Sequence, residues 1–207
     1  MKQTIGLAAK DISCQRGGRL IFERLSFSLA PSDALLVSGP NRAGKTSLLR
    51  QIAGLLPIAA GELRLEGAGP DAHLPELCHY VGHANAVKAS LSVKENLAFW
   101  AHYLDGDATK LDRALAAFGL AQIADLPAGL LSAGQKRRLA LSRVFAAKRP
   151  IWLLDEPQSS LDAASIKLLD AALKDHLETG GIAVVASHTP LKTKFAHRLA
   201  LGGKRAS

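Results

Sequence analysis

Hydrophobic positions recur with two different periods along this chain, and the period changes at clear breaks. Alternation over residues 4–14 and 20–30 predicts two strands, and alternation over 61–67 predicts a third. An apolar strand is predicted at 34–39, and the segment after it has helical spacing that stops near Gly54. The first third of the chain therefore predicts an antiparallel β part beside the start of an α/β core.

Helical patterns dominate the middle of the chain. Strand signals fade from about 75 to 140, where Ser92 and Glu95 have the spacing of a capping box ahead of an apolar helix. Buried strands are then predicted at 150–157 and 182–188, with a helix between them. The α/β rhythm of the first third therefore returns after a helical interruption.

These elements predict the α/β fold class and a single domain over residues 1–207. Its sheet is expected to be mixed and largely parallel, with the antiparallel part near the amino terminus. A helical subdomain at about 84–142 is expected to be inserted into this core. A chain of 207 residues that is 48% hydrophobic is long enough to bury one such core.

Charge and cysteine content limit the kinds of partner and the cellular compartment that we expect. The chain carries 26 Lys and Arg against 18 Asp and Glu, and this net charge of +8 favours a nucleotide, a nucleic acid or a membrane surface as partner. A merely solubilising basic surface is equally consistent with that charge. Cys14 and Cys78 form no C-x-x-C pair, which favours a reducing cytoplasm. Neither a signal-peptide pattern nor an apolar run of ~18 residues is found, so no bilayer crossing is expected.

One segment matches the pattern G-x-x-x-x-G-K-[ST] and lies after a predicted strand, at the start of a predicted helix. Its backbone N–H groups are expected to surround phosphate oxygens, with Lys45 reaching the β- and γ-phosphates and Thr46 binding Mg²⁺. A nucleoside triphosphate with Mg²⁺ is therefore the predicted ligand. The predicted nucleotide-binding residues of this loop are Gly39, Pro40, Asn41, Arg42, Ala43, Gly44, Lys45, Thr46 and Ser47.

Two acidic residues end the strand predicted at 150–157. Asp155 and Glu156 would stand at its carboxyl end, where open α/β sheets bind ligands. Asp155 is the predicted partner of Mg²⁺, and Glu156 is predicted to take a proton from, or to orient, the water that attacks the γ-phosphate. His188 ends the next buried strand and is predicted to contact the γ-phosphate and to hold Glu156. The predicted catalytic residues are Lys45, Glu156 and His188.

A second anion site is predicted in the helical segment. Ser132 is expected to cap a helix whose first turn contains Ala133, Gly134 and Gln135, and three basic residues follow. Free N–H groups, a hydroxyl and the positive end of a helix together suit a phosphate. This second site belongs to the inserted lobe, whereas the phosphate loop belongs to the core.

The segments GPNRAGKTS, LSAGQKRR, WLLDEP, SSLD and ASH, in this order, resemble the nucleotide-binding subunit of an ABC transporter over nearly the whole chain. The resemblance implies a P-loop NTPase core, ATP as the nucleotide and a homodimer whose two copies meet head to tail. The turn of one copy, Ser132 to Gln135, would clamp the γ-phosphate held by the other copy. Asp162, in SSLD, would link the two sites, and hydrolysis would open the dimer.

Two departures from the common pattern narrow the resemblance. His83 stands where most members have a glutamine, and Arg16 stands where an aromatic residue commonly stacks on adenine. Together with the segments RGGR, GKTSLLR and LSAGQ, these residues resemble the ATPase subunits of bacterial haem exporters of cytochrome c biogenesis. Arg16 would then stack on the base, and His83 would sense Mg²⁺ and the γ-phosphate as a further candidate metal ligand. Arg42 replaces a usual glycine, and would either alter the loop or add a phosphate contact.

The narrower resemblance implies a peripheral subunit at the cytoplasmic face of the bacterial inner membrane. Its partners would be two integral membrane subunits, which dock near His83 and the segment 92–100. Phe99 and Trp100 would either receive a helix of that partner or pack in the core. Hydrolysis would power haem export, or release of a haem-loaded periplasmic chaperone. Direct haem binding is not expected, because no C-x-x-C-H motif occurs and the histidines are scattered.

Three other functions are left open by the residues themselves. The ATPase of another ABC transporter with a different cargo would share every assigned site residue. A chromosome-maintenance or ribosome-associated ATPase would suit the charge, but such proteins usually have a long coiled coil or two tandem cassettes, so no nucleic-acid partner is expected. A small-molecule kinase would explain the phosphate loop, but not Ser132 to Gln135 or Asp162.

Overall fold

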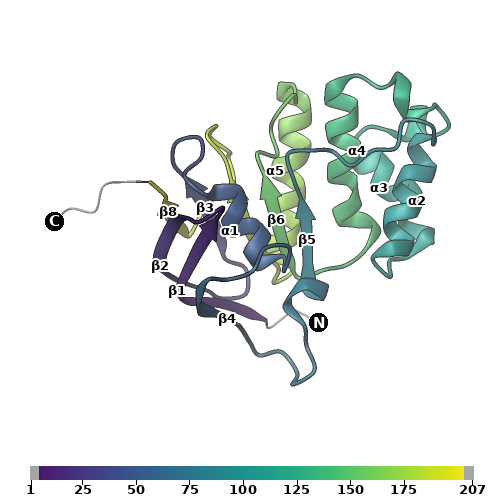
Figure 1. Cartoon of the computed structure of the whole chain (residues 1–207). Helices are drawn as coiled ribbons and strands as arrows, with labels where there is room; N and C mark the ends of the chain where they lie inside the picture. Colours follow the sequence, from purple (N-terminus) through teal and green to yellow (C-terminus); the bar gives the residue numbers. More distant parts are fainter. Residues whose placement is uncertain (1–4, 203–207) are drawn as a thin grey trace.

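An antiparallel sheet forms the amino-terminal part of the structure, which is a computed structural model that describes residues 5–202 (Figure 1). Its strand order is β2-β1-β4, where β1 spans Gly6–Arg16, β2 spans Arg19–Leu29 and β4 spans Ala60–Glu66. Gly17 and Gly18 join the first two strands with φ angles of 53° and 76°, the left-handed values that a two-residue hairpin turn of type I′ needs. The three predicted strands are confirmed; Thr4 and both ends of the predicted domain lie outside the described residues.

A second sheet of five strands is parallel throughout, in the order β5-β6-β7-β3-β8. Its strands are β3 (Ala34–Ser38), β5 (Cys78–Val81), β6 (Ile151–Asp155), β7 (Ile182–Ala186) and β8 (His197–Ala200). Every residue of β6 and β7 is buried, because both faces of the sheet are covered. The α/β fold class is confirmed, and the parallel and antiparallel pairings that we predicted fall into separate sheets.

Two short strands depart from the sequence expectation. The strand β5 lies within the region where strand signals fade, and no strand was predicted at the position of β8. Each spans four residues, and β8 has exposed residues at three of them. Strands this short present too few positions for a period of two to be recognised.

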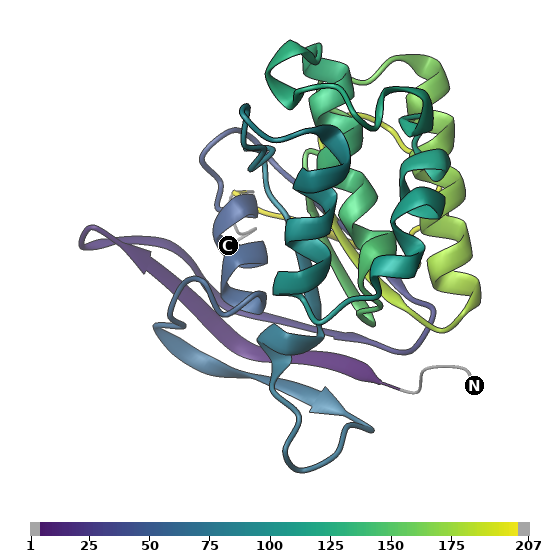
Figure 2. The same cartoon turned by 90° about the vertical axis from the view of Figure 1, so that its right-hand side faces the viewer.

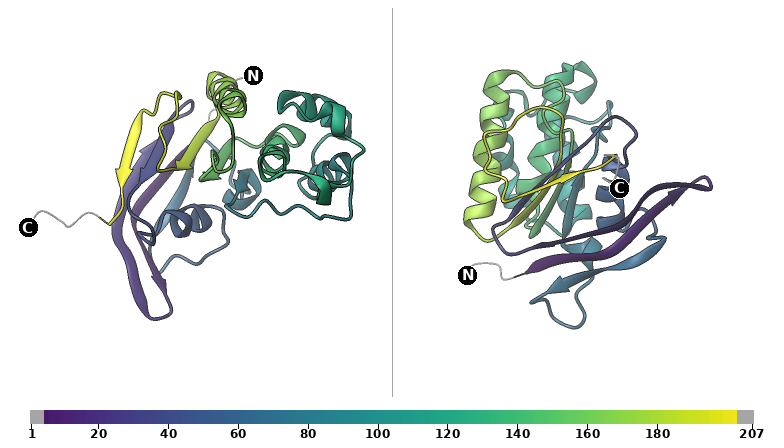
Figure 3. Two further views of the ribbon diagram at one scale, coloured as in Figure 1. Left: turned by 90° about the horizontal axis from the view of Figure 1, so that it is seen from above. Right: turned by 90° about the vertical axis from the view of Figure 1, so that its left-hand side faces the viewer.

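Helices cover the parallel sheet and extend away from it. The helix α1 (Lys45–Ile52) follows the phosphate loop, and α5 (Ala163–Glu178) connects β6 to β7. The helices α2 (Val93–Tyr103), α3 (Leu111–Ala117) and α4 (Ala133–Ala146) pack on one another on the side of the parallel sheet away from the antiparallel sheet (Figures 2 and 3). We propose that these three helices form the body of the subdomain expected at 84–142. Single turns of 3₁₀ helix lie at Leu74–Leu77, Ala108–Lys110, Ala121–Ile123 and Ala128–Leu130.

Helix α2 begins as its sequence predicts. The Ser92 hydroxyl accepts a hydrogen bond from the Glu95 backbone N–H at 3.1 Å, and the Glu95 carboxylate accepts one from the Ser92 N–H at 2.7 Å. This reciprocal pair satisfies two of the N–H groups that a helix start leaves without partners, which confirms the capping box.

No helix in the described part of the chain is both long and apolar enough to cross a membrane.

The parallel sheet separates two hydrophobic cores. Successive residues of a strand point to opposite faces, so Trp152 and Leu154 of β6 face the core shared with α2–α5. Ile151 and Leu153 face the other core, between the two sheets and α1. Because the same strand is held from both faces, the acidic residues at its carboxyl end have a fixed position.

Two histidines are buried in the neutral form at the end of the sheet opposite to those acids. His79 is 2% exposed and its Nε2 lies 2.7 Å from the Ala147 carbonyl oxygen. His176 stacks on Trp152, with ring centroids 3.9 Å apart. Burial lowers the pKa of His79 to about 3 and the pKa of His176 to about 4, since a charged imidazole cannot be hydrated there.

These lowered pKa values predict a loss of stability in mild acid. The unfolded chain takes up a proton on each histidine near pH 6.5 and the folded chain does not, so their contribution is complete above that pH and falls below it. Each histidine then costs about 1.4 kcal/mol of unfolding free energy per pH unit, or roughly 2 kcal/mol at pH 5. Urea unfolding at pH 7 and pH 5 measures this, and His79→Gln, which keeps a donor, is expected to remove about half of it. An unchanged pH dependence in His79→Gln would contradict the assignment.

Candidate active site

A cavity of about 900 Å³ opens at the carboxyl edge of the parallel sheet. Its lining combines residues of the phosphate loop, Asp155 and Glu156 at the end of β6, and His188 after β7. Arg16 at the end of β1 and His83 after β5 also line it. The structure therefore brings together residues that we predicted from five separate segments of the chain.

The phosphate loop is held by close contacts that depend on glycine. Gly39 and Gly44 have φ angles of 133° and 104°. A Cβ atom at Gly39 would collide with the Leu201 carbonyl oxygen, and one at Gly44 would lie 2.7 Å from the Ile21 side chain. The loop is thus fitted between β8 and the β1–β2 hairpin, and α1 begins directly after it at Lys45.

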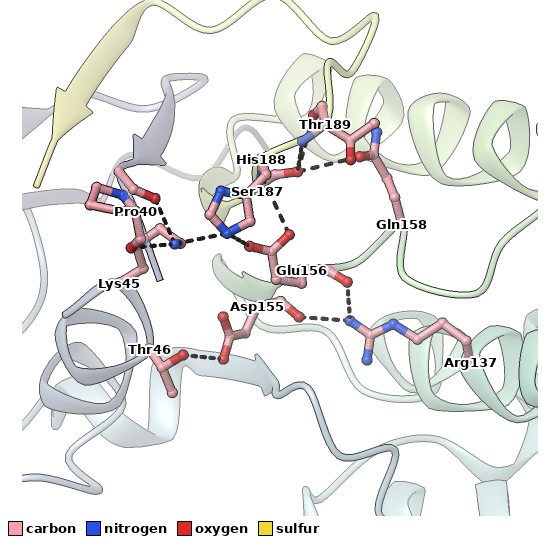
Figure 4. A network of polar contacts seen from close by, with 11 residues as sticks. Pro40, Lys45, Thr46, Arg137, Asp155, Glu156, Gln158, Ser187, His188 and Thr189 are labelled. Carbon is pink, nitrogen blue, oxygen red and sulfur yellow. Dashed lines mark hydrogen bonds and ion pairs between the residues drawn. The ribbon is translucent and has the colours of Figure 1, made fainter. Parts of the chain in front are cut away.

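Lys45 is 7% exposed and its ammonium group bonds within the protein. Its Nζ donates to the Gly39 carbonyl oxygen at 2.8 Å and to the Pro40 carbonyl oxygen at 3.2 Å, and it lies 3.0 Å from His188 Nε2 (Figure 4). An ammonium group can only donate. We therefore assign Nε2 of His188 as the acceptor of this bond and place the ring proton on Nδ1.

The hydroxyl of Thr46 donates to the Asp155 carboxylate at 2.8 Å (Figure 4). Asp155 is 2% exposed, so the hydroxyl and the carboxylate form a small group of oxygen ligands beside the phosphate loop. Mg²⁺ prefers such oxygens, and usually takes one or two from a protein and the rest from phosphates and water. Residues 5–202 hold no preformed group of three His, Cys, Asp or Glu, but a site completed by phosphate does not need one.

Glu156 lines the cavity, and one of its carboxylate oxygens is buried without a hydrogen-bond partner in the described part of the chain. The His188 backbone N–H donates to its Oε2 at 3.4 Å, whereas its Oε1 makes no hydrogen bond in the described part of the chain. His188 Nε2 lies 3.1 Å from Oε1, but it already accepts from Lys45 and has no proton to donate. A buried carboxylate oxygen of this kind keeps an unused capacity to accept a hydrogen bond.

The backbone at Glu156 adopts a left-handed conformation, with φ of 47°. This conformation costs a non-glycine residue about 1–2 kcal/mol, and it persists only where neighbours hold it in place. One such contact is the hydrogen bond from the Glu156 N–H to the Ala186 carbonyl oxygen, at 2.8 Å. The Glu156 side chain is directed toward His188 and lines the cavity (Figure 4).

Arg42 also adopts a left-handed conformation, with φ of 69°, and its exposed side chain lines the cavity. The sequence left two consequences open, an altered loop or an added phosphate contact. The loop has the backbone conformation that suits glycine at this position, so arginine is accommodated with strain. A phosphate contact by its guanidinium stays a prediction.

The turn at Ser132 lies apart from this cavity. Ser132 caps α4, and its hydroxyl accepts from the Gln135 N–H at 3.2 Å, while the Gln135 side chain accepts from the Ser132 N–H at 2.8 Å. Ser132 and Ala133 are exposed, and none of residues 132–135 lines the cavity. A Cβ atom on Gly134 would lie 2.8 Å from the Ser160 carbonyl oxygen, so glycine allows this turn to pack on the SSLD segment.

Asp162 lies outside the cavity as well. Its carboxylate caps α5 by accepting from the Ser165 N–H at 2.7 Å, and hydrogen bonding with Ser165 lowers the pKa of Asp162.

Cys14 and Cys78 are buried free thiols, and burial raises the pKa of Cys78 to about 12. Neither thiol lines the cavity.

Sequence reasoning missed Arg137. We grouped it with Lys136 and Arg138 as part of a basic run, but it is only 2% exposed. Its side chain is buried between the rest of α4 and the segment after β6. Its helical phase carries a signal, because Leu141 and Val144 continue the same buried face at spacings of four and seven residues. A basic side chain on an apolar face is ambiguous from sequence alone, since a long stem can bury while its charged end stays in water.

Known proteins resemble this chain in sequence and in fold. The model of the ABC transporter family matches residues 22–159. A protein of Rhodopseudomonas palustris (strain BisB5), named cytochrome c biogenesis ATP-binding export protein CcmA, is 50% identical over 185 residues, covering 89% of this chain and 92% of its own length. A protein of the same name from Nitrobacter winogradskyi is 49% identical over 197 residues, which cover 95% of this chain and 98% of that protein. A solved structure described as an ABC transporter ATP-binding protein of Pyrococcus furiosus has the same fold, with a TM-score of 0.82 and 22% identity over 95% of this chain and 97% of its own.

The strain at Arg42 predicts that Arg42→Gly stabilises the protein. Glycine removes the left-handed penalty but gains freedom in the unfolded chain, so we expect the free energy of unfolding to rise by up to ~1 kcal/mol. Asn41→Gly is the matched control, because Asn41 is exposed in the same loop with φ outside the left-handed region, and it should lower stability instead. Urea unfolding measures both, and an equal loss in the two variants would show that Arg42 is not strained.

Proposed function

This chain belongs to the ABC transporter family, and we propose that it is the ATP-hydrolysing subunit of a bacterial exporter for cytochrome c biogenesis. One observation carries the ATPase assignment. The loop lysine, the Thr46–Asp155 pair and the partnerless Glu156 oxygen meet in one cavity. The assignment to cytochrome c biogenesis is supported by relatives of that name with about half their residues identical. The alternative is the ATPase of an ABC transporter with a different cargo, which would use the same site.

We propose that the triphosphate takes over the bonds that now occupy Lys45. The loop N–H groups and the start of α1 surround the phosphates, and Lys45 exchanges the carbonyls of Gly39 and Pro40 for phosphate oxygens. Thr46 and Asp155 hold Mg²⁺, which supplies positive charge to the β- and γ-phosphates when bound. Arg16 lies at the cavity wall beside Gly17, where its guanidinium can stack on the adenine ring.

We propose that Glu156 orients the attacking water and accepts its proton. Its Oε1 makes no hydrogen bond within the described residues and supplies the acceptor, and the residue stands in the cavity lining. Once Lys45 turns to the nucleotide, His188 Nε2 no longer accepts from Lys45. After the ring proton moves from Nδ1 to Nε2, the ring can donate to Glu156 or to a γ-phosphate oxygen. His83, exposed at the cavity rim, would sense the γ-phosphate and Mg²⁺.

The second anion site supports a homodimer. The turn at Ser132 is exposed and lies outside the cavity of its own chain, so it is free to reach the nucleotide of a second copy. Each triphosphate would then be held by the phosphate loop of one copy and by Ser132 to Gln135 of the other, with Asp162 near the junction. ATP closes this dimer and hydrolysis opens it.

We infer that two integral membrane subunits dock on the helices, at the cytoplasmic face of the inner membrane. Phe99 and Tyr103 of α2 are 55% and 67% exposed, so Phe99 does not pack in the core. Trp100 lies beside them, with the Arg143 guanidinium 4.3 Å from its ring centroid. An exposed aromatic group of this kind suits a partner helix. Hydrolysis would power haem export or release of a haem-loaded periplasmic chaperone, and no direct binding of haem or nucleic acid by this chain is proposed.

The role of Glu156 predicts the behaviour of Glu156→Gln. An amide cannot accept the water proton, so ATP turnover should fall by about 10²- to 10⁴-fold while ATP still binds and dimers accumulate. Phosphate release and size-exclusion chromatography with ATP measure these effects. Glu178→Gln, a change of the same kind at an exposed site on α5, is the control and should hydrolyse ATP normally. Wild-type turnover in Glu156→Gln would refute the assignment.

The shared sites predict complementation between two inactive variants. Ser132→Arg blocks the turn and Lys45→Ala disables the loop, so each homodimer should be inactive. A mixed dimer contains one site with an intact loop and an intact turn. Equal mixing makes about half of the dimers mixed, each with one of two sites restored, so roughly a quarter of wild-type activity is expected. Activity that never exceeds that of the unmixed variants would count against sharing.

A further inference from the structure

Arg137 joins the helical part of the chain to the catalytic strand. It lies in the second turn of α4, five residues after Ser132, and its side chain is almost completely buried. Its guanidinium donates to the carbonyl oxygens of three consecutive residues at the end of β6, to Asp155 at 2.7 Å and to Glu156 at 2.9 Å (Figure 4), and to Pro157 at 3.1 Å. These three bonds surround the left-handed residue Glu156 on both sides.

The same guanidinium also reaches the loop that carries His83. It donates to the Gly82 carbonyl oxygen at 2.7 Å and to the Asn85 side-chain oxygen at 3.2 Å. One side chain therefore connects the helix capped by Ser132, the backbone of Glu156 and the loop after β5. All five acceptors are uncharged oxygens. The planar guanidinium therefore fixes the positions of these groups through hydrogen bonds and forms no ion pair with them.

We propose that Arg137 is a positioning residue for ATP hydrolysis, which holds the left-handed turn at Glu156 and makes it move as one unit with the Ser132 turn and the His83 loop. This proposal rests on the proposed function, since it needs Glu156 to act on the nucleotide. The Ser132 turn acts on the nucleotide bound by the second copy, whereas Glu156 acts on the nucleotide bound by its own chain. Arg137 thus links the two half-sites within one chain.

Lysine cannot reproduce this arrangement. Its ammonium group offers three donors from one point, whereas the five acceptors are spread over three successive peptides and a separate loop. Arg137→Lys keeps the charge and most of the volume but loses the geometry. Arg137 does not line the cavity, and its five acceptors include no residue of the phosphate loop, so nucleotide binding should be preserved.

The test compares Arg137→Lys with Arg138→Lys in the full-length protein. Arg138 is the matched control, because within residues 5–202 its guanidinium donates only to the Phe118 and Gly119 carbonyl oxygens of the helical part. We expect Arg137→Lys to lower kcat by about ten- to a hundredfold, as small misplacements of catalytic groups do, with KM for ATP changed less than about threefold. Arg138→Lys should keep kcat within about twofold. Equal kcat values in the two variants, or a loss confined to KM, would overturn the proposal.

A double variant separates positioning from general damage. If Arg137 acts through Glu156, adding Arg137→Lys to Glu156→Gln should cause little further loss of kcat. Losses that multiply would show that Arg137 acts elsewhere and would overturn the proposal. Failure of the proposed function has a different signature, since Glu156→Gln would then turn over ATP like the wild type.

A milder variant covers the case in which Arg137→Lys does not fold. Asn85→Ala removes one of the five acceptors and leaves the others in place. We expect it to lower kcat about two- to fivefold in the wild-type background and to have no effect in Glu156→Gln. An unchanged kcat in Asn85→Ala, or an equal loss in both backgrounds, would overturn the link to the His83 loop.

Discussion

The hydrogen bond from Thr46 to Asp155 depends on the register of three parallel strands. Asp155 of β6 pairs with Ala186 of β7, and Val37 of β3 pairs with the same residue. The three strands therefore end at one level, and the chain leaves each of them at the edge where the cavity opens. The phosphate loop follows β3, Asp155 and Glu156 lie at the end of β6, and His188 follows β7. A shift in the register of one strand would therefore displace its site residues from those of the other two. Packing of two hydrophobic cores against opposite faces of these strands keeps that register.

The groups at this edge satisfy one another in the structure, and this accounts for their chemistry. Lys45 is held by the Gly39 and Pro40 carbonyls and by His188, so the positive charge is already in place before any phosphate arrives. Among the buried side-chain atoms that the structure describes at this edge, Glu156 Oε1 is the one without a hydrogen bond, and it belongs to the residue that would activate water in the proposed reaction. A site arranged in this way needs only an exchange of partners to act, and preorganised groups of this kind lower reaction barriers most effectively.

Much of this arrangement could be predicted from the sequence, because its elements are local. The phosphate loop, the buried strands β6 and β7 and the capped start of α2 depend on residues close together in the chain. The missed features depend on distant contacts. Burial of Arg137 is decided by carbonyl oxygens about twenty residues away, and the left-handed turn at Glu156 by hydrogen bonds to β7 and α4. The short edge strand β8 is defined by its pairing with β3, which no periodicity reveals.

A structure of this protein with Mg²⁺ and a non-hydrolysable ATP analogue tests the central claim most directly. The account predicts that the triphosphate lies along residues 39–46, that Lys45 Nζ leaves the Gly39 and Pro40 carbonyls for phosphate oxygens, and that Ser132 of a second copy contacts the γ-phosphate. An analogue bound elsewhere, with Lys45 still on its carbonyls and the Ser132 turn far from any nucleotide, would contradict it.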